Sequence, residues 1–235
     1  MSIQVDQLTK IYGTQKAIDG ISFSAKPGRI LGFLGPNGAG KSTTMKILSG
    51  YTPQTSGKAN VAGFDVTSQS LEVRKNLGYL PEHNPLYLDM YVKESLEFIG
   101  KLHYVHHLKR RIADVIELTG LGVEQHKRIG ALSKGYRQRV GIAQAIIHDP
   151  QVLILDEPTS GLDPNQLVEI RKLLKDLGQT KTLILSTHIM QEVEAICDDV
   201  VIINKGKIVA NESLKSLIEV NKSKSLEAIF LTLTS

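Results

Sequence analysis

Hydrophobic and polar residues follow two different patterns along the chain. Short apolar runs of strand length alternate with longer stretches of helical periodicity, which is typical of an α/β fold. The runs at 3–11 and 17–24 predict two strands of an antiparallel, hairpin-like edge, and 29–34 predicts a third, strongly apolar strand. The runs at 152–155 and 182–185 are short and mostly apolar, as expected for central parallel strands that are buried on both faces.

The remaining stretches add helices and a second hairpin. Between 92 and 120 the apolar residues follow a helical period, and we predict a separate helical lobe inserted into the α/β core. The other predicted elements are a helix over 41–49, a strand over 76–80 that ends at Pro81, a helix over 140–148, a hairpin of 200–204 and 207–210, and a helical tail from 213 with a break near 221–225.

Composition narrows the class of protein. A chain of 235 residues is long enough for one domain with a large core. Its single cysteine, Cys197, excludes an internal disulfide and with it a disulfide-stapled secreted scaffold. No apolar run approaches the roughly 20 residues that span a bilayer, and residues 1–6 lack the features of a signal peptide, so we expect a cytosolic chain. The net charge of +4, without a dense Lys/Arg block, gives no reason to expect nucleic-acid binding.

A phosphate-binding loop follows the strand predicted at 29–34. Residues 35–42 read Gly-Pro-Asn-Gly-Ala-Gly-Lys-Ser, which matches the P-loop pattern at every fixed position. Glycines let successive backbone N–H groups point inward, and the helix that follows adds the positive end of its dipole. Lys41 can then reach the β- and γ-phosphates, and the Ser42 hydroxyl can bind Mg²⁺. The alternative, a chance glycine-rich turn, leaves the preceding strand and the following helix unexplained.

Two acidic residues end the strand that begins at 152. Side chains alternate between the faces of a strand, so Asp156 and Glu157 point in different directions and suit different tasks. Asp156 can hold the Mg²⁺ shell, and Glu157 can orient and polarise a water aimed at the γ-phosphate. The alternative is a strand end that simply becomes polar at the surface, which is the common interpretation of one acid without a P-loop.

His188 follows another predicted strand end. In an open parallel sheet, ligand chemistry gathers at the carboxyl ends of the strands, so His188 is a candidate contact of the γ-phosphate. Taken alone, a histidine at a strand end more often has a structural role.

These motifs together give a family resemblance over essentially the whole chain. With Tyr12, the segment Leu-Ser-Lys-Gly-Tyr at 132–136 and Ser-Gly-Leu-Asp at 160–163, they occur in the order found in the ATP-binding subunit of an ABC transporter, which the chain resembles. The resemblance implies a P-loop NTPase core with a mixed sheet, an antiparallel β subdomain and an inserted α-helical subdomain at about 83–148. It places these in an ATPase domain of residues 1–220, followed by a short tail at 221–235.

The resemblance also implies partners and cofactors. ATP and Mg²⁺ are the expected cofactors, with Ser42, Asp156 and Glu82 as the Mg²⁺ residues. An integral membrane permease, encoded as a separate chain, is the expected partner and would hold this chain at the inner face of the cell membrane. Two nucleotide-binding domains, as a homodimer or a pseudo-dimer, are expected to close head to tail on two ATP molecules.

Individual roles follow from the same resemblance. Glu157, His188, Lys41 and Glu82 are implied in catalysis. Tyr12 matches an aromatic residue that stacks on adenine, although a tyrosine packed on a strand edge is an equal alternative when the other motifs are set aside. The implied ATP-binding positions are Tyr12, Gly35, Pro36, Asn37, Gly38, Ala39, Gly40, Lys41, Ser42, Thr43, Ser133, Gly135 and Asp163.

Three of these positions are implied in a contact between subunits. Ser133 and Gly135 match signature-loop positions that touch the γ-phosphate bound to the other subunit, and Asp163 matches a loop that crosses the dimer interface. Each chain is therefore expected to carry two incomplete half-sites. The segment 137–148 after the signature loop is expected to be a helix whose N-terminus faces that phosphate.

Two features depart from the family pattern. Lys134 and Tyr136 replace the first glycine and the glutamine of the usual Leu-Ser-Gly-Gly-Gln signature, and Glu82 stands where the family usually has glutamine. Glutamate keeps an oxygen ligand but adds charge. Both departures, and the segment 225–231, resemble the branch that drives ABC-2-type membrane partners, with the gliding-motility-associated subgroup as the nearest match.

The predicted function is therefore ATP hydrolysis that powers a separate permease, as part of an exporter. A non-transport ATPase of the same superfamily, acting on nucleic acid or ribosomes, is the main alternative. Such proteins typically carry long coiled-coil inserts or two fused nucleotide domains, for which this chain has no room, and it lacks a basic stripe. A P-loop kinase for a small acceptor would leave the 132–136 segment, Asp163 and His188 without a purpose.

Overall fold

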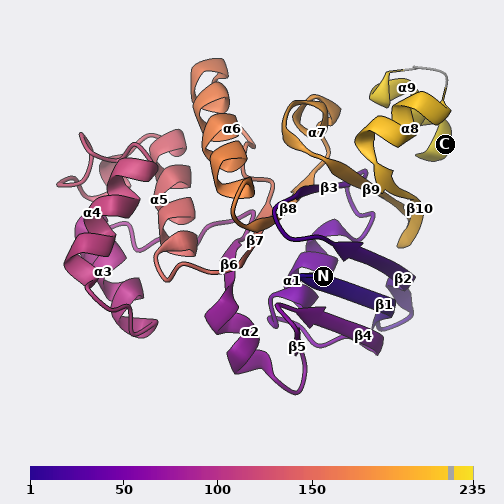
Figure 1. The fold of residues 1–235 in the computed structure, drawn as a ribbon, viewed down its shortest axis with the longest axis horizontal. Coiled ribbons are helices and arrows are strands. Elements are labelled where there is room, and N and C mark those ends of the chain that lie inside the picture. The colour runs from indigo at the N-terminus through magenta and orange to yellow at the C-terminus, as the bar shows by residue number, and fades with distance from the viewer. Residues whose placement is uncertain (222–224, 235) are drawn as a thin grey trace.

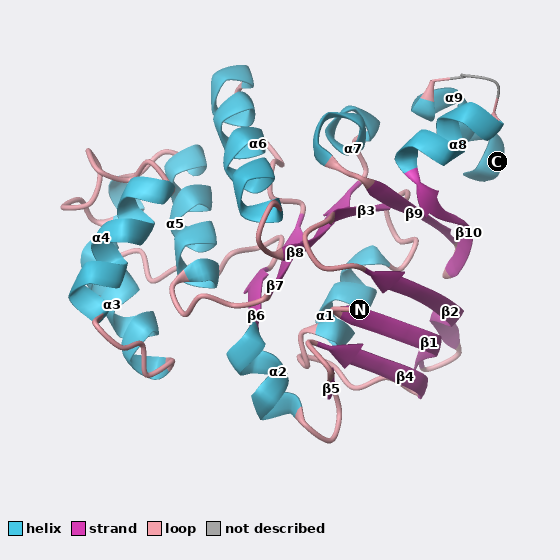
Figure 2. Cartoon of the chain, in the orientation of Figure 1, coloured by secondary structure: helices cyan, strands magenta, loops and turns pink. Residues whose placement is uncertain are grey.

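The computed structural model describes residues 1–221 and 225–234, which fold into two sheets and the helices that surround them (Figures 1 and 2). The predicted break near 221–225 falls partly on residues 222–224, which lie outside the described residues. Among the described residues, no helix combines the length and the apolar content that crossing a membrane requires.

The first sheet is antiparallel and four-stranded, with the order β2-β1-β4-β5. It contains β1 (Ile3–Tyr12), β2 (Gln15–Ala25), β4 (Ser56–Val61) and β5 (Phe64–Asp65). In β1 and β2 buried apolar residues such as Ile3, Val5 and Phe23 face the core, where the Phe23 ring packs 5.2 Å from that of Phe33. The predicted hairpin is confirmed, since β1 and β2 pair antiparallel through to Tyr12 opposite Gln15.

The second sheet has six strands in the order β10-β9-β3-β8-β7-β6. Its strands are β3 (Ile30–Leu34), β6 (Leu77–Leu80), β7 (Val152–Asp156), β8 (Thr182–Thr187), β9 (Asp199–Asn204) and β10 (Lys207–Ser213). All pairs are parallel except β9 with β10, so the sheet is mixed and the predicted second hairpin is confirmed. Every residue of β3, β7 and β8 is buried, as predicted for central strands.

Helices pack around both sheets (Figure 1). They are α1 (Lys41–Leu48), α2 (Ser70–Asn76), α3 (Val92–Leu102), α4 (Leu108–Leu118), a short 3₁₀ helix (Ile129–Ala131), α5 (Lys134–Ile146), α6 (Pro164–Gly178), α7 (Met190–Ile196), α8 (Leu214–Val220) and α9 (Leu226–Thr234). α3, α4 and α5 bury residues such as Leu96, Val115 and Val140 in one apolar cluster, on the side of the molecule away from the antiparallel sheet.

The stretch predicted to be helical at 92–120 forms two helices, which are separated between Leu102 and Leu108, where Tyr104 and His107 adopt positive φ angles. One helical prediction needs correction. The helix expected from 137 or 140 begins earlier, at Lys134, because the Ser133 side chain caps it by accepting a hydrogen bond from the Tyr136 N–H.

Candidate nucleotide site

The P-loop connects the end of β3 to the start of α1, at the carboxyl edge of the mixed sheet. Its backbone passes close to other parts of the chain. A Cβ on Gly35 would lie 2.5 Å from the Ile203 carbonyl oxygen, and one on Gly40 would lie 2.5 Å from that of Ala17. Gly40 also has a φ of 109°, which side chains strongly disfavour. The loop therefore needs glycine at both positions to follow this path. Along this path, backbone N–H groups at the start of α1 are free to bind phosphate oxygens.

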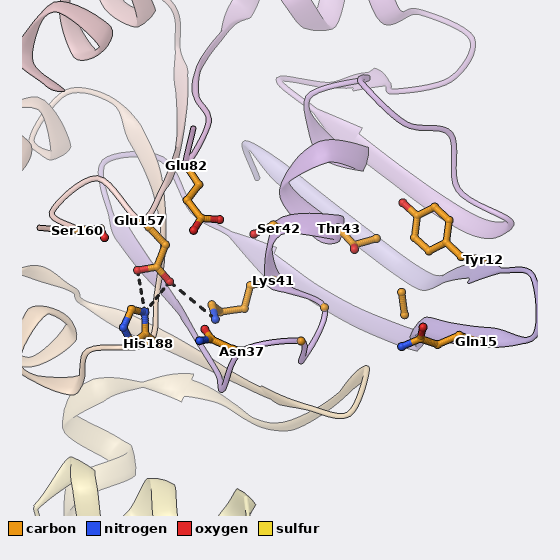
Figure 3. Close-up of a pocket in the computed structure, with 13 residues that line it drawn as sticks. Tyr12, Gln15, Asn37, Lys41, Ser42, Thr43, Glu82, Glu157, Ser160 and His188 are labelled. Carbon is orange, nitrogen blue, oxygen red and sulfur yellow. Dashed lines mark hydrogen bonds and ion pairs between the residues drawn. The ribbon is translucent and has the colours of Figure 1, made fainter. Parts of the chain in front are cut away.

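Lys41 lies inside this loop, with only 6% of its surface exposed. Its Nζ donates to the Gly35 carbonyl at 2.8 Å and to the Pro36 carbonyl at 3.3 Å, and lies 3.8 Å from Glu157 Oε1 (Figure 3). Burial lowers the pKa of Lys41, while the charges of Glu157 and Asp156 oppose that shift. The ammonium group is thus held in place by neutral carbonyls that a phosphate can replace.

Asp156 is 1% exposed and accepts hydrogen bonds from two hydroxyls. Ser42 Oγ donates to its Oδ1 at 3.3 Å, and Ser186 Oγ donates to the same oxygen. Burial raises the pKa of Asp156, and the charge of Glu82 raises it further. Hydroxyl and carboxylate oxygens are the ligands that Mg²⁺ prefers, so Ser42, Asp156 and Glu82 fit that ion.

Glu157 follows Asp156 and faces different partners, but β7 ends at Asp156, so the left-handed backbone of Glu157 and not the alternation of a strand sets its direction. Its carboxylate oxygens lie 2.9 and 3.0 Å from Nδ1 of His188 (Figure 3). The residue is 7% exposed, and its backbone has a φ of 51°, a strained conformation for glutamate. Burial raises the pKa of Glu157, partly offset by the hydrogen bond from His188 and the charge of Lys41.

A cavity of about 520 Å³ lies in front of these groups. The residues that line it are Tyr12, Gln15, Ala17, Asn37, Gly38, Gly40, Lys41, Ser42, Thr43, Glu82, Glu157, Ser160 and His188. Figure 3 shows Tyr12 and Gln15 at one end and Glu157 with His188 at the other. Tyr12 is 48% exposed, with Lys10 Nζ 4.9 Å from its ring centre. The remaining loop residues, Gly35, Pro36 and Ala39, form the backbone behind the lining.

Sequence reasoning missed four residues of this region. Gln15 and Ala17 line the cavity because β2 pairs with β1 beside Tyr12, so the predicted hairpin was the available signal. Ser186 reaches Asp156 because β8 lies next to β7, with Asp156 opposite Ser186 in the register. Ser160 lies in a segment that carried the family resemblance, but it was not assigned to the site.

Three predicted ATP-binding residues lie apart from the cavity. Among the described residues that line it, none is Ser133, Gly135 or Asp163. They occur instead where α5 and α6 begin: Ser133 caps α5, and Asp163 caps α6 by accepting from the N–H groups of Asn165 and Gln166 at 3.1 and 3.0 Å. A Cβ on Gly135 would lie 2.3 Å from Gln166 Oε1, so these two helix starts pack against each other. One chain thus carries two separate groups of predicted ATP-binding residues.

Comparison with known proteins identifies the family. The model of the family described as ABC transporter matches residues 18–160. The ABC transporter ATP-binding protein NatA of Bacillus subtilis (strain 168) is 38% identical over 92% of this chain and 90% of its own length. The bacitracin transport ATP-binding protein BcrA of Bacillus licheniformis is 40% identical over 88% of this chain and 68% of its own length.

Solved structures agree with this assignment. An ATP-binding subunit of an ABC transporter superposes with a TM-score of 0.91 at 26% identity, covering 100% of both chains. The cbiO1 protein of Clostridium perfringens superposes with a TM-score of 0.81 at 30% identity, covering 94% of this chain and 92% of that one. The resemblance to the gliding-motility-associated subgroup stays a prediction. The chain belongs to the ABC transporter family, as one of its ATP-binding ATPase subunits.

Proposed function

We propose that this chain binds Mg²⁺-ATP in the cavity in front of the P-loop and hydrolyses it to drive export through a separate permease. The observation that carries the proposal is that Lys41 lies within ion-pair distance of Glu157, and His188 within hydrogen-bond distance of it, at the end of a P-loop cavity. Relatives named for linearmycin resistance and Nod factor export, 38% and 36% identical, support the export direction.

In this proposal ATP lies with its adenine at one end of the cavity and its γ-phosphate at the other. The exposed ring of Tyr12 can stack on adenine at one end. Backbone N–H groups of 37–43 and the Lys41 ammonium group hold the phosphates. The γ-phosphate then lies toward Glu157 and His188, the groups suited to its transfer.

Ser42, Asp156 and Glu82 would hold Mg²⁺. When bound, the ion supplies positive charge that neutralises the phosphate oxygens. The hydrogen bonds that Ser42 and Ser186 donate to Asp156 favour its ionised form and oppose the burial that raises its pKa.

Glu157 acts on the attacking water. Its carboxylate orients the water and takes one of its protons as the γ-phosphoryl group passes from ADP to the water oxygen. The raised pKa of Glu157 makes the carboxylate a better proton acceptor than an exposed glutamate at neutral pH. His188 holds the carboxylate by its Nδ1 and has its other ring nitrogen available for the γ-phosphate.

The second group of residues completes the site of another chain. Ser133, Gly135 and Asp163 belong to helix starts that lie apart from the cavity of their own chain, so two copies arranged head to tail would join each P-loop to the partner's signature loop. We further propose that 83–148 form a helical subdomain, that 221–235 form a tail, and that the permease holds the chain at the inner membrane face. The related cbiO1 protein, which is part of the ABC transporter complex cbiONQ, supports assembly with further subunits.

The variant Glu157→Gln tests this proposal. It should retain ATP binding, lose hydrolysis by more than about 100-fold because the proton acceptor is removed, and accumulate an ATP-bound dimer. ATPase assays and sedimentation with and without ATP measure both effects, with Glu97→Gln as the control, because Glu97 is an exposed residue of α3. Native turnover in Glu157→Gln would contradict the role of Glu157.

A further inference from the structure

The turn that carries His188 is tied to one buried glutamate. Thr187 ends β8 and Ile189 precedes α7, so these two residues flank His188. Thr187 Oγ1 donates to Glu192 Oε2 at 2.9 Å and accepts from the Ile189 N–H at 3.1 Å. The Glu192 N–H in turn donates to the Ile189 carbonyl at 3.2 Å. These bonds join Glu192 to Thr187 and Ile189, the two residues that flank His188.

The buried side chain of Glu192 lowers the stability of the fold. Both Glu192 and Thr187 are 0% exposed. Among the described residues Glu192 has no ion-pair partner, and its Oε1 has no hydrogen-bond partner. A buried carboxyl group with an unpaired oxygen costs stability, and an apolar side chain of similar size would avoid that cost. A residue that breaks a packing rule in this way indicates a functional constraint.

We propose that Glu192 is a positioning residue for ATP hydrolysis. Glu192 accepts a hydrogen bond from the Thr187 hydroxyl group and so fixes the direction of that group. The hydroxyl oxygen is then free to accept a hydrogen bond from the Ile189 N–H. This second bond sets the path of the 187–189 turn. The turn sets where the His188 imidazole meets Glu157, at 2.9 and 3.0 Å. Reacting groups need such placement, because a displacement of about 1 Å can cost on the order of 100-fold in rate.

The test uses paired variants of the full chain. Glu192→Ala removes the acceptor and Thr187→Val removes the hydroxyl. Each should lower kcat about 10–100-fold and change the KM for ATP less than about twofold, since the P-loop is untouched. Glu192→Gln and Thr187→Ser keep the acceptor and the hydroxyl and should restore most of kcat. Glu194→Ala is the matched control, because Glu194 lies on the same helix but accepts from the Leu226 N–H.

A double-mutant cycle shows whether the effect passes through His188. In a His188→Ala background, Glu192→Ala should lower kcat by less than about twofold further. An equal loss in both backgrounds, or a parallel rise in KM, would overturn the proposal in favour of a general structural role. If Glu192→Ala does not fold, the Thr187→Val and Thr187→Ser pair decides in the same way.

This inference rests on the proposed function, and the same assays separate the two. Native kcat in His188→Ala would overturn the proposed role of His188 and this inference with it. A loss of kcat in His188→Ala together with native kcat in Glu192→Ala would overturn this inference alone.

Discussion

The position proposed for Glu157 in catalysis costs the folded chain stability. The carboxylate is buried, its backbone is in a left-handed conformation, and its pKa is raised by burial. The raised pKa shows that burial outweighs the favourable contacts with His188 and Lys41. The position of Glu157 therefore favours proton transfer beside a phosphate at the expense of folding stability.

Glu157→Gln should accordingly raise the melting temperature of the nucleotide-free chain. Because folding raises the pKa of Glu157, the unfolded chain loses this proton at lower pH than the folded chain does. The free energy of unfolding then falls as pH rises from the ordinary glutamate pKa through the raised one. Glutamine does not titrate, so the gain should be present at neutral pH and absent at low pH, below both pKa values.

Thermal unfolding of both proteins over a pH series measures this difference. A lower melting temperature for Glu157→Gln at neutral pH would mean that the contacts with His188 and Lys41 outweigh burial, contrary to the direction of the shift.

At this scale the sequence predicted several of the residues that meet at the site. Lys41, Ser42, Asp156 and Glu157 stand in short local motifs, and the structure brings all four to one place. It did not predict Ser186 as a partner of Asp156, because that contact depends on which strands are neighbours. Nor did it predict the strained backbone of Glu157, because no residue type at this position indicates a positive φ angle as a glycine would.

Two helices begin at residues predicted to bind ATP, and these residues also stabilise the helices. Ser133 caps α5, and Asp163 caps α6 with Pro164 in its first turn. Both caps use side-chain oxygens that already have backbone partners in this chain. The loops that lead into α5 and α6 are therefore held in place by hydrogen bonds within this chain.

Asp163→Ala should destabilise the free chain through the lost cap. The expected cost is about 1 kcal/mol, because two N–H groups of α6 lose their acceptor. For a chain of this size such a cost lowers the melting temperature by about 2–4 °C. Asp163→Asn keeps the side-chain oxygen and should match the native melting temperature. Equal melting temperatures for Asp163→Ala and the native chain would show that the cap is not needed.

The elements that the sequence predicted best are those with a strong apolar pattern. The central strands β3, β7 and β8 and both hairpins are confirmed. β4, β5, α2, α6 and α7 were not predicted. β5 has two residues and β4 buries few side chains, so neither carries a clear alternation. α6 does carry a helical period, with Ile170, Leu173, Leu174 and Leu177 on its buried face, and the sequence prediction missed it. α7 has only seven residues, too few for a clear period.

At the scale of the whole molecule, the residues predicted to bind ATP form two separate groups. The P-loop group lies at the carboxyl edge of the mixed sheet, and the group of Ser133, Gly135 and Asp163 lies where α5 and α6 begin. Packing between Gly135 and Gln166 fixes the second group as a unit. This separation is the reason to expect that a working site needs two copies of the chain.

Mixing two inactive variants tests this expectation most directly. Lys41→Ala should disable the P-loop, and Ser133→Arg should block the signature loop, so each protein alone should have little ATPase activity. In a mixed dimer, the intact P-loop of the Ser133→Arg chain faces the intact signature loop of the Lys41→Ala chain. We expect the mixture to hydrolyse ATP well above the sum of its separate components. Activity in the mixture equal to that sum, or native activity in Ser133→Arg alone, would contradict a site shared between two copies.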